Sequence, residues 1–92
     1  MWVKYSEQDW YLEEKDIYDE ELQEVCEKLN CSKEEVFLVN YDDDPKICEK
    51  LLNEHSKHKS NLFKVNGCDV YFIYHEGGGV SFFTNKVNID KI

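Results

Sequence analysis

A chain of 92 residues with 20 acidic side chains, 11 lysines and no arginine has a formal net charge of −9. This size fits one small domain, and the acidic balance argues against direct binding of nucleic acid, because phosphate contacts normally supply most of that affinity. Without arginine, the chain also lacks the planar fork that recognises phosphate or guanine through two hydrogen bonds.

The acidic residues are concentrated in the first half of the chain. Residues 1–44 contain 15 acids and four lysines, a net charge of −11, whereas residues 45–92 contain five acids and seven lysines, a net charge of +2. Charges gathered in one part of a domain produce a directed field, which here attracts basic surfaces and repels nucleic acid. The asymmetry therefore predicts a basic partner.

The amino-terminal residues are not expected to form a signal peptide. They lack the basic start, apolar run and small-residue cleavage site of a signal peptide, and no stretch approaches the roughly 20 apolar residues of a membrane span. We therefore expect a cytoplasmic protein with reduced thiols, since disulfides are rare in that compartment. The four cysteines are Cys26, Cys31, Cys48 and Cys68.

Two interpretations are open for residues 1–18. Residues 2–5 have the composition of a short strand. The spacing of Ser6 and Asp9 loosely resembles a capping box and favours a helix over residues 7–14.

Residues 19–29 have the periodicity of an amphipathic helix. Its apolar stripe consists of Leu22, Val25, Cys26 and Leu29. Asn30 suits the end of this helix, because asparagine tolerates the left-handed conformation. Acids in the first turn would complement the helix dipole.

Residues 36–41 are predicted to form a buried strand, because they are rich in β-branched and aromatic side chains. Ser32 and Glu35 fit a capping box just before this strand and open a short helical turn. A helix through residues 33–39 is the alternative, since a short apolar run does not separate the two by periodicity.

A second helix is predicted over residues 45–57. Asp44 suits the N-cap and Pro45 suits the first helical position. The apolar face of this helix consists of Ile47, Cys48, Leu51, Leu52 and His55. Asp42 and Asp43 lack the alternating ligands of a calcium loop, so we interpret them as surplus acids at a helix start.

The last third of the chain predicts a β-meander. Strands over residues 62–65 and 68–75 flank Asn66-Gly67, the strongest two-residue hairpin signal. A glycine-rich turn at residues 76–79 leads into a strand over residues 80–87. Apolar side chains alternate onto both faces of the middle strand. We expect one sheet face to pack the helices and the other to pack the N-terminal segment or a partner.

These elements predict a single α+β domain over residues 1–92. Its antiparallel sheet would have three or four strands, mostly from the C-terminal β-meander. The sheet would pack against the two helices at residues 19–29 and 45–57.

The thiols and imidazoles suggest two chemistries besides simple packing. Cys26, Cys31 and His55 are candidate zinc ligands, but their spacing does not match the tight CxxC pairs of zinc fingers. The second chemistry is a cysteine nucleophile, although acidic surroundings disfavour the thiolate. Its candidate pairs are Cys68 with His75 and Cys48 with His55. Since cysteines on apolar helix stripes usually act as small hydrophobic residues, we expect no metal and no cofactor.

The acidic side chains favour a binding protein over an enzyme. Carboxylates on successive helical turns lie about 5 to 6 Å apart, which approaches the spacing of phosphates along a nucleic-acid strand, and exposed Trp or Tyr side chains would anchor an interface. We expect a non-enzymatic protein whose acidic N-terminal half docks on a basic protein surface. The predicted partner-binding residues are Trp10, Tyr11, Glu13, Glu14, Asp16, Glu20, Glu21, Glu24 and Glu27.

The sharpest form of this expectation is a nucleic-acid mimic that inhibits a DNA- or RNA-processing enzyme. By analogy of size and charge, small acidic phage proteins of the anti-CRISPR or anti-restriction type act on CRISPR and restriction nucleases in this way. Two alternatives are a small intracellular zinc-binding module and an adaptor subunit of a larger assembly, which would use the second sheet face. The simplest explanation of the charge is a solvated surface that maintains solubility.

Overall fold

The computed structural model describes residues 1–92 as a five-stranded antiparallel sheet flanked by helices. Its strands and helices are β1 (Val3–Lys4), α1 (Asp9–Glu13), α2 (Lys15–Leu29), β2 (Val36–Asn40), α3 (Pro45–Ser56), β3 (Leu62–Val65), β4 (Cys68–Tyr74) and β5 (Val80–Asn85). Short 3-10 turns are formed by Tyr5–Glu7, Lys33–Glu35 and Lys86–Asn88. The predicted α+β class is confirmed, but the expected three or four strands are too few.

The sheet has the strand order β1-β2-β5-β4-β3. The C-terminal meander forms one half of it, and β2 joins the meander by pairing with β5, with Val36 opposite Asn85 and Asn40 opposite Ser81. Strand β1 then adds an edge beside β2. Both interpretations of the N-terminal segment are therefore partly right, because a two-residue strand is followed by the short helix α1.

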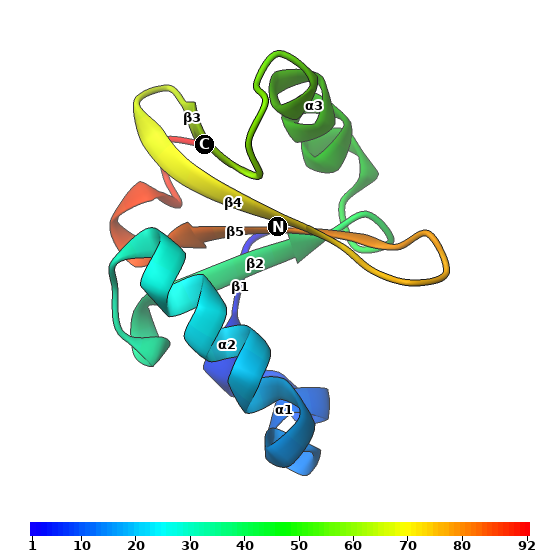
Figure 1. The fold of residues 1–92 in the computed structure, drawn as a ribbon, viewed down its shortest axis with the longest axis vertical. Helices are drawn as coiled ribbons and strands as arrows, with labels where there is room; N and C mark the ends of the chain where they lie inside the picture. Colours follow the sequence, from blue (N-terminus) through cyan, green and yellow to red (C-terminus); the bar gives the residue numbers. More distant parts are fainter.

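Helices α2 and α3 cover opposite faces of the sheet. Tyr71 and Phe83 belong to the core under α2, whereas their chain neighbours Phe72 and Phe82 belong to the core under α3. Successive side chains of a strand point to opposite faces, so the two cores share strands β4 and β5. Figure 1 shows the helices well separated, with the strands running between them.

The expectation that both helices share one face is wrong. The N-terminal segment packs on the same face as α2, since Tyr5 and Tyr11 are buried in that core. Helix α3 covers the other face, on which the N-terminal segment or a partner was expected to pack.

Helix α2 begins at Lys15, four residues before the predicted start. Tyr18 lies one turn before Leu22 and extends the buried stripe, but the exposed Ile17 beside it obscures the periodicity. The predicted end is confirmed. Asn30 has a left-handed φ of 53°, and the Cys31 N–H donates to the Cys26 carbonyl at 3.2 Å, as in a Schellman motif.

The local signals between the elements are also confirmed. Ser32 and Glu35 form the capping box, with the Ser32 N–H donating to Glu35 Oε1 at 3.1 Å, and the strand Val36–Asn40 follows. Asp44 caps α3 by accepting a hydrogen bond from the Ile47 N–H at 3.2 Å. Helix α3 ends at Ser56, one residue before the predicted end.

The turn between β3 and β4 provides a test of backbone strain. Asn66 and Gly67 have φ values of 53° and 80°, as a type I′ turn requires. Gly67→Ala is expected to lower the free energy of unfolding by about 1 to 2 kcal/mol, the usual cost of a left-handed residue with a Cβ atom. Because an added Cβ atom meets nothing within 4 Å at this position, the cost is conformational.

Gly79→Ala is the matched control for that measurement. Gly79 has no positive φ, and its added Cβ atom would make an ordinary contact of 3.8 Å with His75. We expect Gly79→Ala to be neutral or slightly stabilising in urea unfolding. Equal losses for the two variants would contradict the assignment of strain to Gly67.

Candidate functional site

Helix α2 presents a row of carboxylates on its outer face. Asp16, Glu20, Glu24 and Glu27 are exposed and fall on successive turns, on the side of the helix opposite the buried Val25. None of the four is in an ion pair. Side chains one turn apart lie about 5 to 6 Å from each other. We call these four residues the α2 acidic row.

Two more of the predicted acids, Glu13 and Glu14, are exposed at the junction of α1 and α2. They extend the negative surface beyond the first turn of α2. Two large apolar side chains are exposed beside them, Leu12 at 51% and Ile17 at 65%. The exposure of these two apolar side chains was not predictable, because from the sequence alone they are indistinguishable from core positions.

Glu21 and Glu24 also connect α2 to the core beneath it. Glu21 is half-buried and accepts a hydrogen bond from the Tyr5 hydroxyl at 3.1 Å, and Glu24 accepts one from the Tyr71 hydroxyl at 3.3 Å. Burial, together with the charge of Glu21, raises the pKa of Tyr5 well above its usual range. These two acids therefore have a structural role in addition to any role in binding.

The two predicted aromatic anchors have different environments. Tyr11 is only 5% exposed and donates a hydrogen bond to Asp19 Oδ1 at 2.7 Å, so it is a core residue in the free protein. Trp10 is half-buried and packs edge-to-face on Tyr5 and Tyr18, with ring centroids 5.2 and 4.8 Å apart. Of the two, only Trp10 is accessible enough to act as an anchor.

The Tyr11 hydrogen bond predicts a loss of stability at alkaline pH. It raises the pKa of Tyr11 to about 12 in the folded protein, whereas the pKa of a tyrosine in an unfolded chain is about 10. The stabilisation is therefore fully present below about pH 10 and is lost as the pH rises toward the folded pKa. Tyr11→Phe should lower the free energy of unfolding at neutral pH by about 1 kcal/mol and should weaken the alkaline loss, as measured by urea unfolding across this pH range.

Tyr74→Phe is the control, since Tyr74 is 66% exposed and its hydroxyl makes no hydrogen bond within the protein. It should leave both the neutral stability and the alkaline loss unchanged. Identical pH profiles for the two variants would contradict the role assigned to Tyr11.

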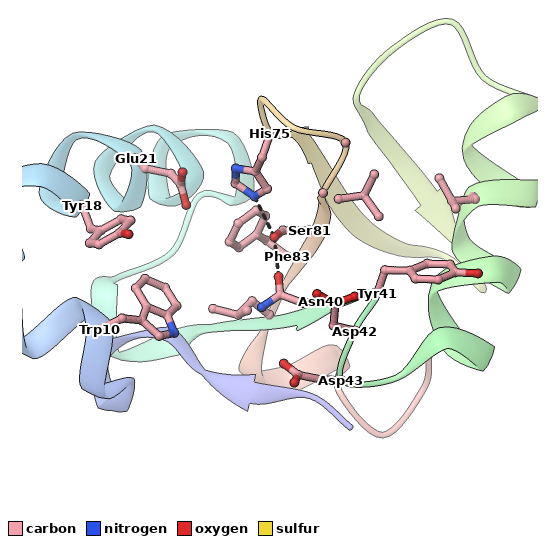
Figure 2. A pocket seen from close by; sticks show the side chains of 15 residues that line it. Trp10, Tyr18, Glu21, Asn40, Tyr41, Asp42, Asp43, His75, Ser81 and Phe83 are labelled. Carbon is pink, nitrogen blue, oxygen red and sulfur yellow. Dashed lines mark hydrogen bonds between the residues drawn. The ribbon is translucent and has the colours of Figure 1, made fainter.

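A cleft of about 650 Å³ opens beside the N-terminal half of α2. Figure 2 shows Trp10, Tyr18 and Glu21 on one side of it, and Asp42 and Asp43 on the other. Residues of β2 and β5 and His75, which follows β4, form its floor, and Gly78 and Gly79 lie at its rim. The volume falls in the range of about 300 to 1,000 Å³ that is usual for ligand sites.

A short hydrogen-bonded chain crosses the floor of the cleft. Ser81 Oγ donates to Asn40 Oδ1, and His75 Nε2 lies 2.8 Å from the same hydroxyl. The chain therefore joins β2, β5 and the residue after β4 across the floor, and the tautomer of His75 sets whether the imidazole donates to Ser81 or accepts from it.

The cysteine–histidine pairs considered for catalysis are not assembled. Cys68 and His75 lie at opposite ends of β4, a separation of about 23 Å at 3.3 Å per residue. Cys48 lies on the buried face of α3, where burial raises the pKa of its thiol to about 11. Its proposed partner, His55, lies two turns further along that helix and stacks on Phe72.

The alternative zinc site is not formed either. Cys26 and Cys31 pack against the core under α2, whereas His55 packs on the opposite face of the sheet. No group of three or more His, Cys, Asp or Glu side chains is placed to hold a metal ion. All four cysteines are free thiols, and burial raises the pKa of Cys31 to about 11.

Comparison with known proteins adds no relative. No family model, no curated protein and no solved structure matches this chain. None of the helices has both the length and the apolar character that crossing a membrane requires.

The sequence did not predict the group of polar residues on the floor of the cleft. This group consists of Asn40, His75 and Ser81. Asn40 and Ser81 are 41 positions apart and meet because β2 pairs with β5 in this register. No periodicity in the sequence signals that pairing. The only hint is that all three are polar residues at the ends of predicted strands.

Proposed function

We propose that this protein is a non-enzymatic binding protein that docks the α2 acidic row on a basic surface of a partner protein. In its sharpest form, it is a nucleic-acid-mimicking inhibitor of a DNA- or RNA-processing enzyme, such as a CRISPR or restriction nuclease. The observation that carries the proposal is the row itself, four exposed carboxylates on successive turns with no lysine paired to any of them.

Inhibition would be competitive. The carboxylates occupy positions that phosphates take on the enzyme, and their field steers the two proteins together, so added salt slows association. Trp10, Leu12 and Ile17 supply apolar contact area next to the charges. This combination suits an interface, because aromatic and apolar anchors retain a complex that charge has brought together.

The state of the thiols supports binding rather than cysteine-based catalysis. Burial raises the pKa values of Cys26, Cys31 and Cys48, so these thiols stay protonated near neutral pH.

The test is affinity capture from a lysate of the native host, with elution first by duplex DNA and then by a salt gradient. We expect a basic nucleic-acid enzyme that duplex DNA displaces and that the purified protein inhibits. A partner that resists both DNA and high salt would contradict the mimic and point to an apolar interface.

A further inference from the structure

We propose that the cleft beside α2 binds an arginine side chain of the partner protein. This inference rests on the proposed function and deepens it. The α2 acidic row would supply attraction at long range, and the cleft would select one cation at short range.

The charges in the cleft are of one sign. Glu21, Asp42 and Asp43 line it, no lysine does, and none of the three carboxylates is in an ion pair. His75 directs its Nε2 atom at Ser81 rather than at these acids. A cation entering the cleft would therefore meet three carboxylates without a competing positive side chain.

The aromatic wall favours arginine over lysine. Trp10 and Tyr18 pack against each other with ring centroids 4.8 Å apart, and both line the cleft. A guanidinium group stacks on aromatic surfaces and has a planar fork of donors that matches carboxylates, whereas an ammonium group is a compact and strongly hydrated charge. Figure 2 places this wall facing Asp42 and Asp43 across the floor.

The rim leaves the cleft open to a side chain from outside. Gly78 and Gly79 line this rim and carry no Cβ atom, and a Cβ atom added at Gly78 would meet only the Tyr74 hydroxyl, at 3.9 Å. A peptide-borne arginine is the expected occupant, because the proposed partner is a protein with a basic surface.

The test uses N-acetyl-arginine-N-methylamide as the ligand and observes the ¹⁵N-labelled protein by NMR. We expect saturable shifts of the Trp10 indole N–H and of the Gly78 and Gly79 amides. The neutral citrulline analogue, which has the same shape, should bind at least about tenfold more weakly. Equal binding of citrulline, shifts confined to other surfaces, or no saturable shift would overturn the inference.

Two variants probe the site without removing its aromatic packing. The triple variant Glu21→Gln, Asp42→Asn and Asp43→Asn should weaken capped-arginine binding at least about tenfold, and Glu21→Gln retains an acceptor for Tyr5. The matched control replaces the exposed Glu13, Glu20 and Glu27 by Gln and should bind as the native protein does. Gly79→Leu keeps every charge and should block the cleft by filling its rim. Equal loss in the control and the triple variant, or undiminished binding by Gly79→Leu, would overturn the inference.

This experiment separates the cleft from the wider proposal. Neutralising the α2 acidic row with Asn and Gln should sharply reduce capture of the partner, and it should weaken capped-arginine binding far less than the triple cleft variant does. A native protein that binds capped arginine in the cleft but captures no basic partner would overturn the proposed function alone. Capture of a basic enzyme without any binding in the cleft would overturn the inference alone.

Discussion

The triple reversal Asp16→Lys, Glu20→Lys and Glu27→Lys is expected to abolish capture of the basic partner while the protein remains folded. All three side chains are exposed and make no ion pair. Their replacement turns attraction into like-charge contact, which costs several kcal/mol at an interface. We expect affinity to fall at least about a hundredfold, measured by surface plasmon resonance, with the thermal unfolding midpoint as the measure of folding.

The control variant has the same net charge, but its three reversals lie elsewhere on the surface. Glu49, Glu76 and Asp90 are exposed acids from the second half of the chain, and their reversal to Lys changes the total charge equally. Affinity should remain near the native value, apart from a slower association at low salt. Equal loss of affinity in the two triple variants would mean that net charge, and not the face of α2, governs binding.

Phe83→Ala is expected to bring the protein close to global unfolding. Phe83 is 1% exposed, lies under α2 and has its ring centroid 6.0 Å from that of Tyr5. Truncation of a buried phenylalanine lowers the free energy of unfolding by about 3 to 5 kcal/mol. The free energy of unfolding of a domain of this size is itself about 5 kcal/mol. Urea unfolding at neutral pH measures the loss.

Phe82→Ala should have a similar effect from the other face, since Phe82 is fully buried under α3. The two tryptophans report on the faces separately, because Trp10 packs on the α2 core and Trp2 on the α3 core. In single-tryptophan variants, both signals should change at one urea concentration. If the core under α3 stayed folded after Phe83→Ala, the two faces of the sheet would not unfold as one cooperative unit.

Local signals predicted most of the secondary structure. The Asn66-Gly67 turn, the Ser32–Glu35 capping box and the Asp44-Pro45 helix start each depend on residues next to one another in the chain, and all three are present. Errors arose where the pattern was short or interrupted. Strand β1 has only two residues, and the exposed Ile17 interrupts the apolar stripe at the start of α2.

The candidate site was predictable only in part. The acids of α2 could be placed on one helix face from their spacing, and they are exposed there. The sequence does not show which of Trp10 and Tyr11 is buried, because both are aromatic neighbours in an acidic segment. Only the packing of the folded chain buries Tyr11. The cleft was not predictable, since its walls come from α1, α2, the loop after β2 and the hairpin between β4 and β5.

By itself, the sequence determined the elements whose signals span a few residues, the excess of acids in the first half and the absence of arginine. The tertiary structure alone decided that β2 pairs with β5, that α2 and α3 take opposite faces, and that Asn40 meets Ser81. The physical reason is that a periodic pattern reports which side of an element is apolar. It does not report which partner buries that side, because the pairing of distant strands depends on the packing of the whole chain.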